Sequence, residues 1–330
     1  MQHAFSGDVR AVVCETNPAL RAGIQTALFA KGIREPTLCR DVDCLTDAMQ
    51  REIVDLLVCD ADLPGTDFCR MVQEIRHSAI GRNPFALIVA TSSDTSAPNV
   101  RRLVGAGVDR VMRKPMPMNV LVGHIAALVQ TRRPFIATED YIGPSRRAPP
   151  RPNDGDINAL DVPNTMRSRI LHGASESHLQ RIVDEGVERI EELKVKNGPL
   201  VIAAAIRRAL LACREGNRQG VANALARVTV LTGQQMHRHR NRGATHLVDL
   251  LSSLSALVER MADCQTMPSK VSFELLANLG EVIRRTNTAG NGTIGVVQEI
   301  AATVDRFTRG DADAADKQRP SGLSGPKPLN

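Results

Sequence analysis

The order of apolar runs in the first 131 residues most narrows the folds open to this chain. Five short apolar runs each precede a stretch of helical periodicity, and they lie at residues 9–13, 37–39, 53–59, 85–90 and 108–112. The helical stretches cover residues 18–31, 41–50, 67–77, 97–105 and 117–131. Strands that alternate with helices form a parallel sheet with helices on both faces. We therefore expect an α/β domain with a doubly wound (βα)5, flavodoxin-like sheet over residues 1–131.

The chain is long enough for a second domain, and the pattern changes beyond residue 131. Its 330 residues correspond to about two domains. Residues 132–165 are rich in proline, arginine and glycine, which predicts a linker without regular elements. From 166 to 310 apolar residues recur at helical spacing, so we expect an all-α bundle of six helices, with Pro199 opening the second. The composition of the tail, 311–330, predicts disorder.

Composition and charge exclude several classes of protein. No apolar run reaches the roughly 18 residues that a membrane span needs. The first eight residues lack the basic patch and apolar stretch of a secretory leader. The seven cysteines form no CxxC pair, which is typical of reduced thiols. We therefore expect a cytoplasmic protein without a membrane segment.

The distribution of charge argues against DNA as a partner. The net charge of +6 lies in residues 166–310, which hold 20 basic and 14 acidic side chains. The densest basic cluster is Arg238, Arg240 and Arg242. Dedicated DNA-binding domains carry a stronger basic stripe, and only 2% of this chain is aromatic and able to stack on bases. A nucleic-acid-binding transcriptional regulator that uses these three arginines is kept as an alternative.

Polar residues follow four of the five predicted strands. They are Cys14 and Glu15 after the first strand, Asp60 and Asp62 after the third, Thr91 after the fourth and Lys114 after the fifth. The carboxyl ends of parallel strands meet at one edge of the sheet, where ligands bind. A carboxylate there can accept a phosphoryl group, a hydroxyl and an ammonium can hold its oxygens, and a second carboxylate can hold Mg²⁺. The pattern therefore favours phosphoryl chemistry.

The spacing of these motifs resembles that of a known family. Val58-Cys59-Asp60 is followed by Leu63-Pro64-Gly65, then by a strand that ends in Thr91, then by Lys114-Pro115. On these motifs residues 9–131 resemble the receiver domain of bacterial two-component response regulators. The resemblance covers the whole first domain, whereas the helical half matches no family.

The resemblance implies a role for each matched residue. Asp60 would be the phosphoacceptor, supplied by a sensor histidine kinase or a phosphotransfer protein. Thr91 and Lys114 would contact the phosphoryl group, and the peptide bond between Lys114 and Pro115 would be cis. Glu15, Asp60 and the backbone carbonyl of Asp62 would bind Mg²⁺.

One departure from the family pattern concerns the metal. The family places acids at both positions 14 and 15, but the first is Cys14 here, and we expect its side chain to face the pocket. A thiol is a poor ligand for Mg²⁺, so we expect weaker metal binding and slower phosphoryl transfer. Cys59 is expected to point into the core instead. A pseudo-receiver scaffold that is never phosphorylated is therefore an alternative.

The length and pattern of the helical half indicate what kind of output domain follows the receiver-like domain. DNA-binding output domains of the family are compact units of well under about 100 residues with a basic recognition helix, unlike residues 166–310. This half shows no convergent acids, nucleophile–base pair or glycine-rich phosphate loop, so we expect no enzyme and no catalytic residues. Its continuous apolar stripes favour a protein-interaction or dimerisation module. We predict a response regulator that signals to a downstream protein partner, with a homodimer left open.

Overall fold

The computed structural model describes residues 5, 7–146, 157–263 and 268–286. The chain forms two compact units, Met1–Asn197 and Gly198–Asn330. The predicted sixth helix of the bundle and the predicted disordered tail lie outside the described residues, as does the middle of the predicted linker.

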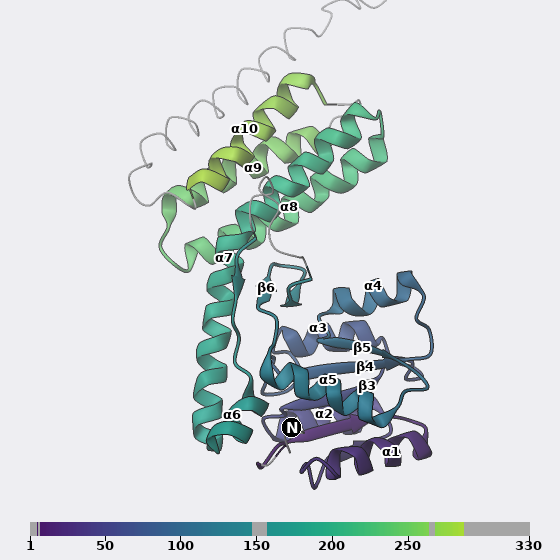
Figure 1. Ribbon diagram of the computed structural model, residues 1–330. Helices are drawn as coiled ribbons and strands as arrows, with labels where there is room; N and C mark the ends of the chain where they lie inside the picture. The colour runs from purple at the N-terminus through teal and green to yellow at the C-terminus, as the bar shows by residue number, and fades with distance from the viewer. Residues whose placement is uncertain (1–4, 6, 147–156, 264–267, 287–330) are drawn as a thin grey trace, which may run out of the picture. The chain divides into compact units, whose positions relative to one another are not determined.

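A parallel five-stranded sheet with the order β2-β1-β3-β4-β5 forms the centre of the first unit (Figure 1). Its strands are β1 (Ala11–Cys14), β2 (Thr37–Cys39), β3 (Leu56–Asp60), β4 (Leu87–Ser92) and β5 (Arg110–Arg113). They alternate with α1 (Pro18–Phe29), α2 (Val42–Arg51), α3 (Phe68–Arg76), α4 (Ala97–Ala106) and α5 (Met118–Gln130). This order confirms the predicted doubly wound fold.

Helices cover both faces of this sheet, which explains the continuous apolar runs of its strands. Alternate residues of a strand point to opposite faces. In β1, Val13 packs under α1 and α5, whereas Val12 packs under α2, α3 and α4. The central strand β3 is therefore buried along its whole length, because neither of its faces meets water.

Local capping fixes where the helices begin after the strand ends. The Asn17 side chain accepts hydrogen bonds from the amides of Ala19 and Leu20 at the start of α1. Asp67 caps α3 and Ser96 caps α4 in the same way. The loops between strand and helix are consequently short, and they hold the polar residues that follow each strand near the edge of the sheet.

The structure differs from the prediction of a linker at residues 132–165. The described part of this segment contains three short antiparallel strands, β6 (Phe135–Ala137), β7 (Ile142–Pro144) and β8 (Ala159–Leu160), in the order β7-β6-β8. Phe135 and Ile142 are buried in a small core with Phe85. The high proline and arginine content concealed these two apolar positions, each of which gains stability from burial.

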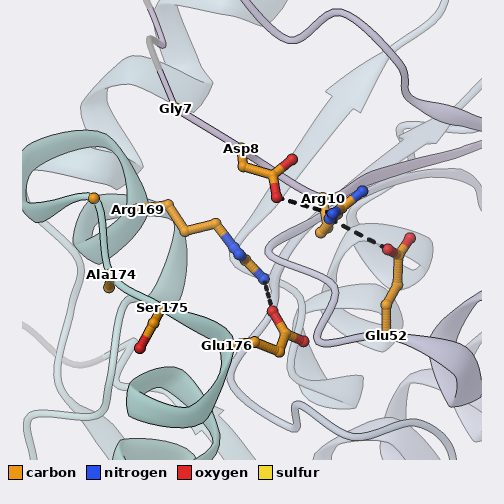
Figure 2. A pocket seen from close by; sticks show the side chains of 9 residues that line it. Gly7, Asp8, Arg10, Glu52, Arg169, Ala174, Ser175 and Glu176 are labelled. Carbon is orange, nitrogen blue, oxygen red and sulfur yellow. Dashed lines mark hydrogen bonds and ion pairs between the residues drawn. The ribbon is translucent and has the colours of Figure 1, made fainter.

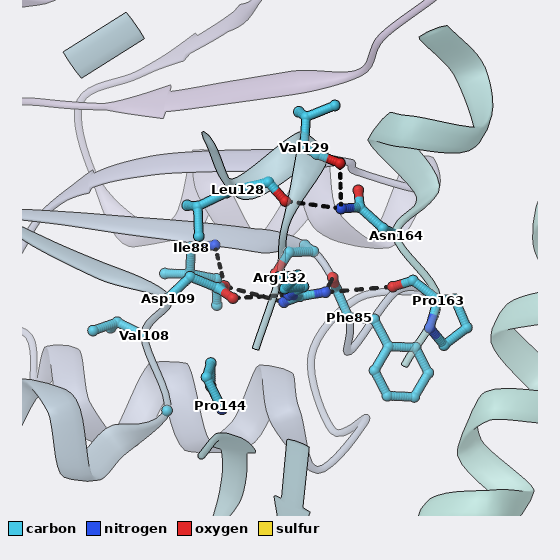
Figure 3. A network of polar contacts seen from close by, with 12 residues as sticks. Phe85, Ile88, Val108, Asp109, Leu128, Val129, Arg132, Pro144, Pro163 and Asn164 are labelled. Carbon is cyan, nitrogen blue, oxygen red and sulfur yellow. Dashed lines mark hydrogen bonds and ion pairs between the residues drawn. The ribbon is translucent and has the colours of Figure 1, made fainter. Parts of the chain in front are cut away.

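A buried ion cluster holds this extension to the sheet (Figure 3). Asp109, which precedes β5, is contacted by Nη2 of Arg76 at 2.8 Å and by Nε of Arg132 at 2.8 Å. Both guanidinium groups also lie over the ring of Phe135, at 5.1 and 4.5 Å from its centroid. Burial acts to raise the pKa of Asp109, but the two arginines lower it below its usual value.

The helices that follow also differ from the prediction. Helix α6 (Thr165–His172) and the first half of α7 (Glu176–Arg214) belong to the first unit, although a single bundle was expected from residue 166. Pro199 lies inside α7 instead of opening a new helix. A proline inside a helix removes one hydrogen bond and crowds the preceding turn, but flanking turns with buried apolar residues such as Leu193 and Ile202 can carry the helix across it.

The second unit is helical in its described part. The end of α7 packs with α8 (Arg218–Arg240), α9 (Thr245–Asp263) and α10 (Lys270–Thr286) around one apolar core. The leucine stripe that was predicted at residues 247–261 is buried there. At Gly280 a Cβ atom would lie only 2.6 Å from Cδ1 of Ile206, so glycine permits α10 to approach α7 closely. Of the helices that the structure describes, none is long and apolar enough to cross a membrane.

Candidate functional site

Three charged residues predicted from the strand ends lie together at the carboxyl edge of the sheet. Asp60 is the last residue of β3, Glu15 follows β1, and Lys114 follows β5. Nζ of Lys114 lies 2.6 Å from Oδ1 of Asp60 and 3.4 Å from Oε2 of Glu15. Two carboxylates thus share one ammonium group in a nearly buried site.

The electrostatic balance of this site keeps the lysine charged. Partial burial acts to lower the pKa of Lys114, but its hydrogen bond to Asp60 and the charges of Asp60 and Glu15 raise it above its usual value. The side chains of Asp60 and Glu15 are only 4% and 2% exposed. With two acids facing one ammonium, the site can still accept further positive charge.

The backbone places Lys114 independently of its charge. Its amide donates a hydrogen bond of 2.9 Å to the carbonyl of Ser92, which extends the pairing of β5 with β4. The peptide bond from Lys114 to Pro115 is cis, as the sequence resemblance implied.

Thr91 lies beside Asp60 but does not contact its carboxylate. The two residues are direct neighbours in the pairing of β3 with β4. The Thr91 hydroxyl lies 3.4 Å from the carbonyl oxygen of Cys59, to which it donates a hydrogen bond, and the side chain is buried. The hydroxyl therefore needs a rotation or a shift of the strand end to reach a group bound to Asp60.

Asp62 turns its carboxylate away from the acidic pair. The carboxylate accepts hydrogen bonds from the Ser92 hydroxyl at 2.9 Å, the Ser93 amide at 2.8 Å and the Ser93 hydroxyl at 2.6 Å. Burial acts to raise the pKa of Asp62, but these bonds lower it below its usual value. The Asp62 amide donates to Oδ1 of Asp60 at 2.9 Å. Asp62 therefore joins the loop after β3 to the end of β4.

The two serines were not singled out as site residues by the sequence. Ser92 and Ser93 follow Thr91 directly, but no periodicity or motif marks a hydroxyl that will bond a carboxylate about 30 residues earlier in the chain. Only the pairing of β3 with β4 brings the two loops together.

The structure corrects the expectation that Cys14 faces the pocket. Its side chain is 1% exposed, and its Sγ lies 3.4 Å from the carbonyl oxygen of Asp41. Cys14 is the register neighbour of Cys39 and Cys59, so three thiols lie side by side in the core beneath α2 and α3. The reason is strand alternation: residue 14 shares the face of Val12, and only Glu15, beyond the strand, turns to the site.

Two thiols of this row, Cys39 and Cys59, are not activated. Burial raises the pKa values of Cys39 and Cys59 well above the ordinary thiol value, so both stay protonated. Cys59 points into the core, as the sequence predicted. Neither thiol is a reactive group in the vicinity of Asp60.

The residues at this edge suit a hard cation such as Mg²⁺. Mg²⁺ is commonly bound by one or two carboxylates with several waters, and here the carboxylates of Glu15 and Asp60 lie on the same ammonium group. Among the described residues no group of three or more His, Cys, Asp or Glu side chains is arranged to hold a metal. A cation at this edge would therefore depend on two side chains, since Cys14 contributes no ligand.

A cavity of about 440 Å³ lies elsewhere in the first unit, lined by residues that precede β1 and β3, by Arg169 of α6 and by the turn from α6 into α7 (Figure 2). Its charges neutralise one another. Arg10 lies 2.8 Å from Asp8 and 3.4 Å from Glu52, and Arg169 lies 2.7 Å from Glu176. The cavity is therefore at the amino ends of the strands, away from Asp60, and none of the predicted site residues lines it.

Comparison with known proteins finds similarity in the first domain. Residues 11–126 match the family model of the response regulator receiver domain. No curated protein sequence matches the chain. Solved structures with a similar fold include a response regulator from Thermotoga maritima, at 16% identity and a TM-score of 0.34, which matches over 37% of this chain and 98% of its own.

Two further solved structures match a similar share of this chain. The chemotaxis protein CheY4 of Vibrio cholerae is 16% identical, with a TM-score of 0.33, and the match covers 36% of this chain and 96% of that protein. A receiver domain protein from Methanospirillum hungatei is 17% identical, with a TM-score of 0.33, over 36% of this chain and 90% of its own. These matches cover only about a third of this chain.

Proposed function

We propose that the receiver domain over residues 11–126 accepts a phosphoryl group on Asp60. The observation that carries this proposal is the contact of 2.6 Å between Asp60 and Lys114, with Glu15 on the same ammonium group. The donor would be the phosphohistidine of a sensor histidine kinase or of a phosphotransfer protein. The chain would then act as a response regulator in a two-component system.

The transfer needs few groups. A carboxylate oxygen of Asp60 attacks the phosphorus, the bond from phosphorus to the histidine nitrogen breaks, and an acyl phosphate forms on Asp60. The ammonium of Lys114 then faces a phosphoryl oxygen. Mg²⁺, when bound by Glu15, Asp60 and the Asp62 carbonyl, supplies positive charge that offsets the charge of the phosphoryl oxygens.

The change of state begins at Thr91. Its hydroxyl leaves the carbonyl of Cys59 and donates to a phosphoryl oxygen, which moves the end of β4. Ser92 and Ser93 follow in that strand end and hold the Asp62 carboxylate, so the loop after β3 responds together with the loop after β4. A change in this surface would alter what the domain binds.

The helical unit is proposed as the output. Its apolar stripes form its own core, whereas the apolar side chains that it exposes, such as Leu211 and Val230, support a module that binds a downstream protein or a second copy of the chain, without an enzymatic activity of its own. The proposed setting is the cytoplasm. The departure at Cys14 leads us to propose weaker Mg²⁺ binding than two acids would give.

The test is the intact mass of the full chain after incubation with acetyl phosphate and Mg²⁺. We expect one phosphoryl adduct on the wild type and none on Asp60→Asn. Lys114→Gln should form the adduct at least about 10-fold more slowly, because it loses a charge-assisted contact. Asp43→Asn is the matched control, since it removes an exposed carboxylate of α2 outside the site, and it should still form the adduct.

Two results would contradict the proposal. One is an adduct that persists on Asp60→Asn. The other is the absence of any adduct on the wild type, also with phosphoramidate and Mn²⁺, which would favour the pseudo-receiver scaffold.

A further inference from the structure

We propose that the outer face of α7 in the second unit binds an acidic, amphipathic segment of a partner protein. This arginine–leucine face consists of Arg207, Arg208, Leu211 and Arg214. The proposal goes beyond phosphorylation of Asp60 and does not depend on it.

The first observation is where the charge excess lies. Residues 198–286 contain twelve basic and six acidic side chains, and the segment from 198 to 248 contains eight arginines and a single acid, Glu215. Helix α8 contains no acidic residue at all. The positive charge therefore belongs to α7 and α8 and is not spread over the unit.

The second observation is the arrangement of the face itself. Arg207, Leu211 and Arg214 are spaced four and three residues apart, so they lie on one side of α7, while Ile206 and Ala209 are buried on the other. Arg207, Arg208 and Arg214 are exposed, and within the described residues they have no acidic or hydrogen-bonding partner. Leu211 is 54% exposed between them.

The neighbouring helix α8 supplies no negative charge to this face. Helix α8 packs along α7, since a Cβ at Gly220 would lie 3.1 Å from that of Ala212 and a Cβ at Gly198 would meet Gln235. It exposes Val230, at 51%, and offers no carboxylate to the arginines of α7. An anion for these arginines must therefore come from outside the described part of this unit.

The combination of an exposed leucine with unpaired arginines favours a protein over a nucleic acid. Phosphates would satisfy the arginines but would leave Leu211 in water, whereas an interface between proteins covers apolar and arginine side chains together. The sequence has no aromatic residue between Tyr141 and Phe273 on which bases could stack. A second copy meeting the same face would bring arginine against arginine, which is repulsive. A partner helix with an apolar residue between acids covers the leucine, pairs with the arginines and needs no aromatic residue for stacking.

The probe is a fluorescein-labelled synthetic helix of about 18 residues that places leucines between glutamates at helical spacing. Its binding to the full-length chain is measured by fluorescence anisotropy. We expect Arg207→Glu/Arg214→Glu to weaken binding at least about 10-fold, because two attractive contacts become repulsive. The matched control is Arg34→Glu/Arg40→Glu, which changes the net charge equally at two exposed arginines of the first unit and should leave the affinity within about 2-fold.

A second pair of variants tests the apolar part of the face. Leu211→Gln should weaken binding by about 3- to 10-fold, because a partner side chain loses its apolar contact. Leu171→Gln is its control, since Leu171 is 58% exposed in α6, and it should bind like the wild type. The circular dichroism of every variant should match the wild type. If Arg207→Glu/Arg214→Glu loses helicity, Arg207→Gln/Arg214→Gln is used in its place, and it should also weaken binding.

Three outcomes would overturn the proposal. The first is that Arg34→Glu/Arg40→Glu weakens peptide binding as much as Arg207→Glu/Arg214→Glu does. The second is equally tight binding of a peptide with alanine in place of leucine. The third is tighter binding of a 20-base-pair duplex that falls steeply with salt and is lost in Arg207→Glu/Arg214→Glu, which would point to nucleic acid. None of these affects the adduct on Asp60, so failure here is distinct from failure of the phosphorylation proposal.

Discussion

At the scale of single residues, two buried acids of the first unit show how the number of partners sets a pKa. Asp109 faces two arginines, and its pKa is lowered although burial acts to raise it. Asp55 is also fully buried but faces one arginine, Arg169, at 2.8 Å, beside a hydrogen bond of 2.8 Å from the Arg10 amide, and Arg169 is shared with Glu176. Burial therefore prevails at Asp55 and raises its pKa to about 6.

We predict that Asp55 makes the first unit more stable at mildly acidic pH than at neutral pH. A carboxyl whose pKa rises from 3.8 to about 6 on folding binds its proton more tightly in the folded state. Its contribution to the free energy of unfolding is therefore complete below about pH 4 and is lost as the pH rises through about 6, by up to about 3 kcal/mol. Urea unfolding of the wild type and Asp55→Asn between about pH 4 and 7.5 should show this contribution shrinking. A difference that stays constant with pH would refute the assignment, and Asp47→Asn, at an exposed acid, is the control.

Arg132 and Arg133 are adjacent but are predicted to differ strongly in importance. Arg132 is buried against Asp109 and donates to the carbonyl of Phe85 at 2.6 Å, whereas Arg133 is exposed and contacts only the carbonyl of Ser145. Arg132→Ala should lower the free energy of unfolding by about 3–5 kcal/mol, since it leaves buried groups without a partner. Arg133→Ala should change it by less than about 0.5 kcal/mol. Equal effects of the two changes in denaturant unfolding would contradict the view that the cluster anchors the extension.

At the scale of elements, a pair of glycines decides how closely the extension approaches the sheet. Gly107 ends α4 with a φ of 105°, and a Cβ there would lie 2.5 Å from the carbonyl oxygen of Ile142 in β7. Gly143, the next residue of β7, would place a Cβ 2.7 Å from the Cα of Gly107. The backbones of α4 and β7 therefore touch only because both positions lack side chains.

Two glycines of the same helix are predicted to respond in opposite directions to alanine. Gly107→Ala should destabilise the first unit by about 2 kcal/mol or more, because it adds both a strained φ and a clash with backbone. Gly105, inside α4, has open space at its Cβ, and Gly105→Ala should stabilise the unit by about 0.5–1 kcal/mol. Thermal unfolding of the two variants checks this. A loss of stability at position 105, or none at 107, would contradict it.

At the scale of the whole molecule, the first unit is larger than the receiver domain alone. The family match ends at residue 126, but the unit continues to Asn197 through β6, β7, α6 and part of α7. Three of the side chains that satisfy or cover buried groups of the sheet come from this extension, namely Arg132, Phe135 and Arg169. The extension therefore completes the core of the domain at the amino ends of the strands.

We predict that a fragment of residues 1–197 unfolds as one cooperative unit, and that a fragment of residues 1–131 is less stable or aggregates. The shorter fragment retains Asp55 and Asp109 but loses Arg169 and Arg132, and it exposes Phe85. Uncompensated buried charges and newly exposed apolar surface both lower the free energy of unfolding. Denaturant unfolding of the two fragments is the measurement. Equal stability of both would show that the extension contributes nothing to the core.

The sequence by itself determined the features that depend on local pattern. The alternation of strands and helices, the burial of β3 and the gathering of Glu15, Asp60 and Lys114 all follow from periodicity and from the rule that parallel strand ends meet at one edge. The leucine stripe of α9 was found in the same way. Each of these can be derived from neighbours in the chain and one topological rule.

Only the tertiary structure decided the direction of Cys14, the strands β6 and β7, the passage of α7 through Pro199 and the partners of Asp109. The last residue of a strand can point to either the core or the site, and Cys14 follows the strand because its thiol packs beside Cys39 and Cys59. A segment rich in proline and arginine forms strands here because Phe135 can be buried against Phe85. These outcomes depend on burial by residues far apart in the chain, which local pattern cannot show.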